Sequence, residues 1–145
     1  SVGEVADSIQ AFAAYSGVPI VRIDEEMCRD AVRKGDKIAV MATLSTTLSP
    51  TVGTVKRVSR EINKPVEVVE ALVEGAFGLD QDEFKERMLA TAKEVASDAD
   101  CIIFAQGSMA YAEDFIRENV EAKIFSSPAY GARELRKALE FKGLL

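Results

Sequence analysis

The sequence predicts a doubly wound α/β fold, in which helices cover both faces of a parallel sheet. Segments rich in β-branched residues alternate with segments of helical periodicity, which is the pattern of βαβ units. The run Ile38–Met41 is apolar without interruption, as expected of a strand that is buried on both faces. Because 48% of the 145 residues are hydrophobic, a sizeable core can form.

The first part of the chain predicts two helices with a short strand between them. Apolar residues at helical spacing indicate a helix over residues 2–15, and Gly17 is placed to end it. Val18–Ile23 is rich in β-branched residues and predicts a strand. Asp24 is a good N-cap residue, so we expect a second helix from there to Lys34.

The middle of the chain predicts two more strands with a helix between them. Lys37–Met41 forms a strand that leads into the hydroxyl-rich segment 42–49. Ser49 followed by Pro50 predicts the start of a helix, because Ser is a common N-cap and Pro is favoured at the first helical position. Val66–Leu72 predicts the next strand.

The last part of the chain continues the alternation of helices and strands. Asp80 and Glu83 have the spacing of a capping box and predict a long helix that runs to about Ser97. The remaining predicted elements are a strand over Cys101–Ala105, a helix over Met109–Glu118, a strand over Lys123–Phe125 and a final helix that begins at Ser126-Ser127-Pro128.

The composition excludes several kinds of chemistry. The chain contains no histidine, which excludes His-based triads, His general bases and His-containing metal sites within it. Its formal net charge of −6 gives no electrostatic footprint for nucleic acid or an anionic membrane. No apolar run approaches the ~20 residues of a membrane span. We therefore expect a soluble, cytoplasmic protein that binds neither nucleic acid nor membrane.

Polar, uncharged side chains follow two of the predicted strands. The first group has five hydroxyls ahead of a helix: Thr43, Ser45, Thr46, Thr47 and Ser49. Free backbone N–H groups and the helix dipole suit such a place to a carboxylate or phosphate. The second group is Gln106, Gly107 and Ser108, in which the glycine permits a tight turn. Since ligands of open α/β sheets bind beyond the carboxyl ends of the strands, the two groups predict a site for a small anion. Capping and turning are the structural alternative for each group.

The other candidates are weaker. Asp24-Glu25-Glu26 could bind Mg²⁺, or Asp24 could act as the acceptor of a response-regulator-like module, but acidic residues in the first turn already favour the helix dipole. No Gly-rich dinucleotide or phosphate-loop fingerprint occurs, so we predict no cofactor and no metal. Cys28 and Cys101 are too few for a disulfide framework and match no zinc-ligand spacing, so small buried hydrophobes are the simplest interpretation.

Several of these segments together resemble the aspartate/glutamate (and hydantoin) racemase superfamily. Ala42–Ser49 resembles the loop that opens the second domain of that family, where the usual pattern is small-Thr-x-x-Thr-x-x-Ser. Asp100–Met109 resembles a later strand of the same domain, and Glu74–Phe77 agrees with the segment before its long helix. The resemblance covers most of the chain, from about residue 18 onward.

The resemblance implies two similar α/β domains that face one another across the ligand. It also implies a cofactor-independent reaction in which two cysteines act on opposite faces of the α-carbon. By this match Thr43, Thr46 and Ser49 would bind the substrate carboxylate, with Ser45 and Thr47 as neighbours of lesser weight.

The chain departs from the family pattern at both cysteines. Gln106 stands at the position of the second cysteine, and glutamine cannot take or return a proton in that role. Cys101 lies about five residues too early, and the first cysteine would precede Ser1. We therefore assign no catalytic residue with certainty and expect no efficient two-cysteine racemisation.

The resemblance also divides the chain into three parts. Residues 1–34 are expected to be the closing part of a truncated first α/β domain, 35–125 a second α/β domain, and 126–145 a C-terminal helix that packs back toward the first. So small a remnant cannot bury a core alone, so we expect homo-oligomers. The predicted ligand is a small carboxylate, bound by residues 43–49 and 106–108. A non-catalytic carboxylate-binding or regulatory module, and a one-cysteine decarboxylase or isomerase, remain alternatives.

Overall fold

The computed structural model describes residues 5, 8–76 and 78–144, and its centre is a parallel sheet of four strands. The strands are β1 (Lys37–Ala42), β2 (Glu67–Leu72), β3 (Cys101–Phe104) and β4 (Lys123–Ser126). They lie in the order β2-β1-β3-β4, and every neighbouring pair is parallel. The chain adds β2 on one side of β1 and then β3 and β4 on the other, so the predicted fold class is confirmed.

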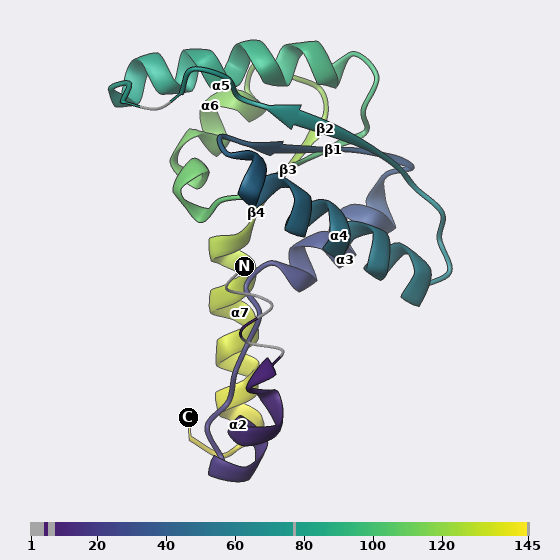
Figure 1. The fold of residues 1–145 in the computed structure, drawn as a ribbon, viewed down its shortest axis with the longest axis vertical. Helices are drawn as coiled ribbons and strands as arrows, with labels where there is room; N and C mark the ends of the chain where they lie inside the picture. The colour runs from purple at the N-terminus through teal and green to yellow at the C-terminus, as the bar shows by residue number, and fades with distance from the viewer. Residues whose placement is uncertain (1–4, 6–7, 77, 145) are drawn as a thin grey trace.

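Helices cover both faces of this sheet (Figure 1). One face carries α3 (Glu25–Lys34) and α4 (Ser45–Glu61). The other carries α5 (Gln81–Ala96), the 3₁₀ helix η1 (Gly107–Ala112) and α6 (Glu113–Arg117). Successive side chains of a strand point to opposite faces. Each strand of the middle pair therefore contributes to two separate apolar cores, which contain Ile38, Val40 and Ile103 on the α3/α4 face and Ala39, Met41, Ile102 and Phe104 on the other.

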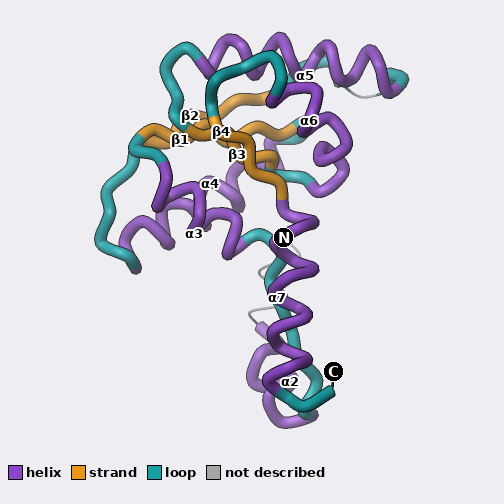
Figure 2. The backbone as a smooth tube through the Cα atoms, turned by 180° about the vertical axis from the view of Figure 1, so that it is seen from behind, coloured by secondary structure: helices purple, strands orange, loops and turns teal. Residues whose placement is uncertain are grey.

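Two helices do not cover the sheet. They are α7 (Ser127–Phe141), which begins directly after β4, and α2 (Gln10–Ser16), which lies beside the far end of α7 (Figures 1 and 2). Residues 17–23 run back along α7 toward the sheet, and the Lys142 ammonium donates a hydrogen bond to the Gly17 carbonyl over 2.7 Å. We call α2, residues 17–23 and α7 the arm, and the sheet with α3–α6 and η1 the body.

The predicted strand over Val18–Ile23 is wrong. These residues form irregular backbone, because no strand of the described part of the chain lies beside them to complete a hydrogen-bonded ladder, and Pro19 has no N–H to contribute. They pack instead on α7, where Gly131 leaves room for Ile23. A Cβ at position 131 would lie only 2.6 Å from Cγ2 of Ile23.

The predicted start of α4 at Ser49 is also wrong, because the helix begins one turn earlier. Leu44 is its N-cap, and the Leu44 carbonyl accepts the amides of Thr47 and Leu48 over 3.0 and 3.1 Å. Pro50 therefore lies inside the helix rather than at its first position. The cap at Asp80 is confirmed, since its carboxylate accepts the amides of Asp82 and Glu83.

The predicted helix over Met109–Glu118 is divided into two short elements, η1 and α6. Part of the predicted helix over residues 2–15 lies outside the described residues, as does Phe77 of the family-like segment 74–77. Within the described residues, no helix is both long and apolar enough to cross a membrane.

Candidate functional site

The two predicted polar segments meet at the carboxyl edge of the sheet. Thr43 follows β1 and Gln106 follows β3, and these strands are neighbours, with Met41 opposite Phe104 in the register. Between β1 and β3 the order of connection reverses, which makes this a topological switch point. Ligands of open α/β sheets bind at such a place.

Thr43 and Gln106 are in direct contact. The backbone N–H and the Oγ1 hydroxyl of Thr43 both donate to Oε1 of Gln106, each over 2.8 Å. An amide N–H can only donate, so the side-chain atom that faces it must be the oxygen. The NH₂ group of the half-buried Gln106 therefore points elsewhere, and it has no hydrogen-bond partner in the described part of the chain.

The first turn of α4 adds further donors beside this contact. Ser45 and Thr46 are exposed, and their backbone amides have no acceptor among the residues that the structure describes. Thr47 is half-buried, and Ser49 is exposed in the second turn, on the same helix face as Ser45. Because α4 starts earlier than predicted, its free amides and positive dipole end lie directly after Thr43.

Gly107 and Ser108 open η1 and are exposed. A Cβ at position 107 would lie 3.7 Å from Oγ of Ser127, so the start of α7 packs close to this loop. Sequence reasoning did not assign Ser127 or the nearby Glu113, whose carboxylate accepts a hydrogen bond from the hydroxyl of Ser126 at the end of β4. These contacts join residues far apart in the sequence, and no local pattern marks them.

Neither cysteine lies in the two candidate loops. Cys101 begins β3, at the amino end, and Cys28 lies in α3, and both are buried. Burial raises the pKa of Cys28 to about 12 and also raises the pKa of Cys101. The two thiols are therefore protonated at neutral pH, and neither belongs to the segment of Thr43 or of Gln106.

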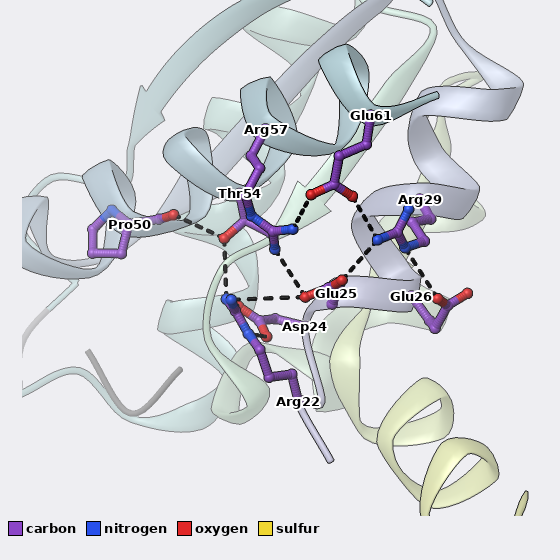
Figure 3. A network of polar contacts seen from close by, with 9 residues as sticks. All are labelled: Arg22, Asp24, Glu25, Glu26, Arg29, Pro50, Thr54, Arg57 and Glu61. Carbon is purple, nitrogen blue, oxygen red and sulfur yellow. Dashed lines mark hydrogen bonds and ion pairs between the residues drawn. The ribbon is translucent and has the colours of Figure 1, made fainter. Parts of the chain in front are cut away.

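The acidic segment Asp24-Glu25-Glu26 is neutralised by arginines (Figure 3). Arg22 pairs with Asp24 over 3.0 Å, and Arg29 and Arg57 each approach Glu25 to 2.8 Å. Burial raises the pKa of Glu25, but the hydrogen bonds from Arg57 and Arg29 outweigh it and hold the pKa below 4.5. No group of three or more potential metal-ligating side chains occurs among the described residues. The geometry gives this segment a structural role, joining the start of α3 to α4.

Comparisons with known proteins agree with the geometry of the sheet. A sequence profile of the Asp/Glu/hydantoin racemase family matches residues 6–135. No curated protein sequence matches the chain. The allantoin racemase from Klebsiella pneumoniae has a similar fold, with a TM-score of 0.60 and 16% sequence identity over 88% of this chain and 52% of that one.

A second allantoin racemase, from Pseudomonas fluorescens, has a TM-score of 0.58 and 21% identity over 88% of this chain and 55% of that one. This chain therefore spans about half the length of these two racemases. The profile match covers most of the sequence, and the chain belongs to the Asp/Glu/hydantoin racemase family.

Proposed function

We propose that this chain supplies the carboxylate-binding half of a racemase- or isomerase-type site. The ligand is a small carboxylate at the edge formed by residues 43–49 and 106–108. The observation that carries the proposal is the contact of Thr43 with Gln106, which joins the two loops at the switch point beside the unpaired amides of Ser45 and Thr46. Unpaired donors at a helix N-terminus favour an anion.

Among the described residues, neither of the two loops carries a thiol that could exchange a proton with carbon. Gln106 occupies the position at which the family resemblance implies a thiol, and a carboxamide is neither an acid nor a base near neutral pH. Cys28 and Cys101 are buried elsewhere. In this proposal the two loops bind and orient a carboxylate, and a thiol that exchanges the proton would be supplied from outside them. The alternatives are a one-cysteine decarboxylase or isomerase, and a non-catalytic module that binds a small carboxylate or has a regulatory role.

A thermal-shift titration tests the binding site. Aspartate, glutamate, malonate and succinate serve as probes, with the amides of these acids as neutral controls. A ligand present at 100 times its Kd stabilises the folded state by about 2.7 kcal/mol. Thr46→Ala should reduce the ligand-dependent shift, whereas Thr91→Ala, a matched substitution on α5, should not. An equal shift in both variants, or none with any acid, would contradict the proposal.

Exchange of the α-proton in D₂O tests the missing acid–base chemistry. ¹H NMR of aspartate, glutamate and a substituted hydantoin should show no exchange above the uncatalysed rate, since no described thiol lies at the site. Steady exchange by the purified chain would show that it contains a competent base and would contradict the assignment.

We also propose that copies of the chain associate through the arm. Phe12 is 71% exposed, and Tyr15 and Phe141 are each 92% exposed, so the arm presents large apolar side chains to solvent. Sedimentation velocity should detect a dimer or larger species that Tyr15→Asp with Phe141→Asp weakens. If the chain stays monomeric over a concentration range of about 100-fold, self-association is contradicted.

A further inference from the structure

Both hydrogen-bond donors of Thr43 donate to a single atom of Gln106. Its hydroxyl proton and its amide proton converge on Oε1, each over 2.8 Å. A hydroxyl has one proton to donate, so Thr43 cannot also donate to a ligand oxygen while this contact exists. From the proposed function above, we infer that Thr43 is a positioning residue, which holds the Gln106 carboxamide with its NH₂ group directed to the ligand.

The orientation of the carboxamide follows from this pairing. Rotating the amide by half a turn would place NH₂ against the backbone N–H of Thr43, so that donor would face donor, and the Thr43 hydroxyl could then only accept. The backbone N–H favours this orientation in every variant, and the hydroxyl adds a second hydrogen bond that limits the motion of the carboxamide. Thr43→Val removes the hydroxyl but keeps the β-branched shape, whereas Thr43→Ser keeps the hydroxyl.

The oriented amide defines the class of ligand. NH₂ offers donors and no acceptor, so it selects a ligand that presents an acceptor oxygen, and a charged carboxylate oxygen forms the stronger bond. Gln106 therefore serves as a contact for an oxyanion at a position where a thiol would exchange protons. Gln106→Glu is a stringent variant, because one carboxylate oxygen can still accept from Thr43 while the other repels an anion.

The experiment follows the side-chain NH₂ signals of Gln106 by ¹⁵N NMR in the ligand-free chain and during titration with malonate. In the ligand-free chain, Thr43→Val should change the chemical shifts of the two Gln106 NH₂ protons, and Thr43→Ser should leave these shifts as in the wild type. Loss of one neutral hydrogen bond should raise the Kd for malonate about 3- to 10-fold in Thr43→Val. Gln106→Glu should weaken malonate binding by more than about tenfold, with unchanged backbone spectra around residue 43.

The outcomes separate the two proposals. An unchanged Gln106 NH₂ pair in ligand-free Thr43→Val would overturn the positioning role whether or not malonate binds. If Thr43→Val loses malonate binding while that pair stays unchanged, Thr43 is itself a ligand contact and the inference is wrong. If the wild-type chain does not bind malonate but the free-state NH₂ pair responds to Thr43→Val and not to Thr43→Ser, the positioning role stands and the carboxylate assignment fails.

Discussion

The body and the arm of this molecule are built on different principles. In the body, both faces of the sheet are closed by apolar cores, and Phe104, Met41 and Ile103 are completely buried. In the arm, Ala13 is the one buried residue among those of α2, and most large apolar side chains are exposed. The body therefore has the burial that a self-sufficient fold requires, whereas the arm presents the kind of surface that a second protein body covers.

Polar contacts, together with the packing of Tyr130 against the core on the α3/α4 face, attach the arm to the body. The Tyr130 hydroxyl donates to Asp30 of α3 over 2.6 Å. Arg22 donates to Oγ1 of Thr54 in α4 over 3.2 Å, next to its ion pair with Asp24 (Figure 3). The candidate binding loops lie wholly on the body, at the point where α7 leaves it. A second protein chain bound to the arm would therefore be attached close to the candidate site.

The largest predicted difference between the two regions is in thiol reactivity. A thiol whose pKa is about 12, as for Cys28, is ionised to only about 1 part in 10⁴ at pH 8, and burial blocks access to it as well. Tyr15→Cys would place a thiol on an exposed site of the arm. Ellman's reagent should modify it at least about 10³-fold faster than either native cysteine. Rapid reaction of Cys28 or Cys101 in the folded chain would contradict the closed body.

The second largest predicted difference between the body and the arm is in the loss of stability when an aromatic ring is removed. Phe104→Ala removes a completely buried ring of the body and should lower the free energy of unfolding by about 3–5 kcal/mol. Phe141→Ala removes a ring of the arm that is 92% exposed and should change it by no more than about 0.5 kcal/mol. Urea unfolding followed by far-UV circular dichroism measures both. Similar losses would show that the arm is packed more tightly than described.

Two glycines test the attachment of residues 17–23. Gly131→Ala forces the new Cβ against Ile23, at 2.6 Å from Cγ2, and overpacking of this kind costs about 1–3 kcal/mol. Gly53→Ala on α4 meets nothing within 4 Å, so the higher helix propensity of alanine should stabilise the chain by about 0.5–1 kcal/mol. Urea unfolding measures whether each substitution raises or lowers the free energy of unfolding. Hydrogen exchange of residues 17–23 measures whether their packing on α7 is weakened. Stabilisation by both substitutions would mean that Ile23 does not pack on α7.

The smallest predicted effect is the pH dependence from the arginine–carboxylate network. The pKa of Glu25 lies below 4.5 in the folded chain, so its ionised form is favoured by folding. That stabilisation is complete above the unfolded pKa and is lost as the pH falls below about 4.5 toward the folded pKa. Arg57→Gln should flatten this part of the pH profile of urea unfolding. An unchanged profile in the variant would show that the ion pair with Arg57 does not hold the pKa of Glu25 down.

The fold was largely predictable because its signals are local. The run Ile38–Met41 is apolar throughout because both faces of β1 are covered, and four consecutive residues are therefore enough to predict a buried strand. Val18–Ile23 carries the same β-branched preference, yet the absence of a neighbouring strand decided its conformation. Ser49-Pro50 likewise matches a helix start, but α4 begins earlier because Leu44, two residues after the end of β1, is its N-cap.

The candidate site was predictable in position more than in role. Parallel strands end at the same edge of a sheet, so polar segments after β1 and β3 had to be neighbours. That both donors of Thr43 meet Oε1 of Gln106 depends on side-chain geometry across 63 residues of sequence, which no spacing rule encodes.

We propose that the edge between β1 and β3 binds small carboxylates, and amide chemical shifts of the ¹⁵N-labelled chain provide the decisive test. On titration with malonate, saturable shifts should cluster at residues 43–49 and 106–108, together with the side-chain NH₂ of Gln106. Shifts confined to the arm, or no saturable shift at these two loops, would contradict the account.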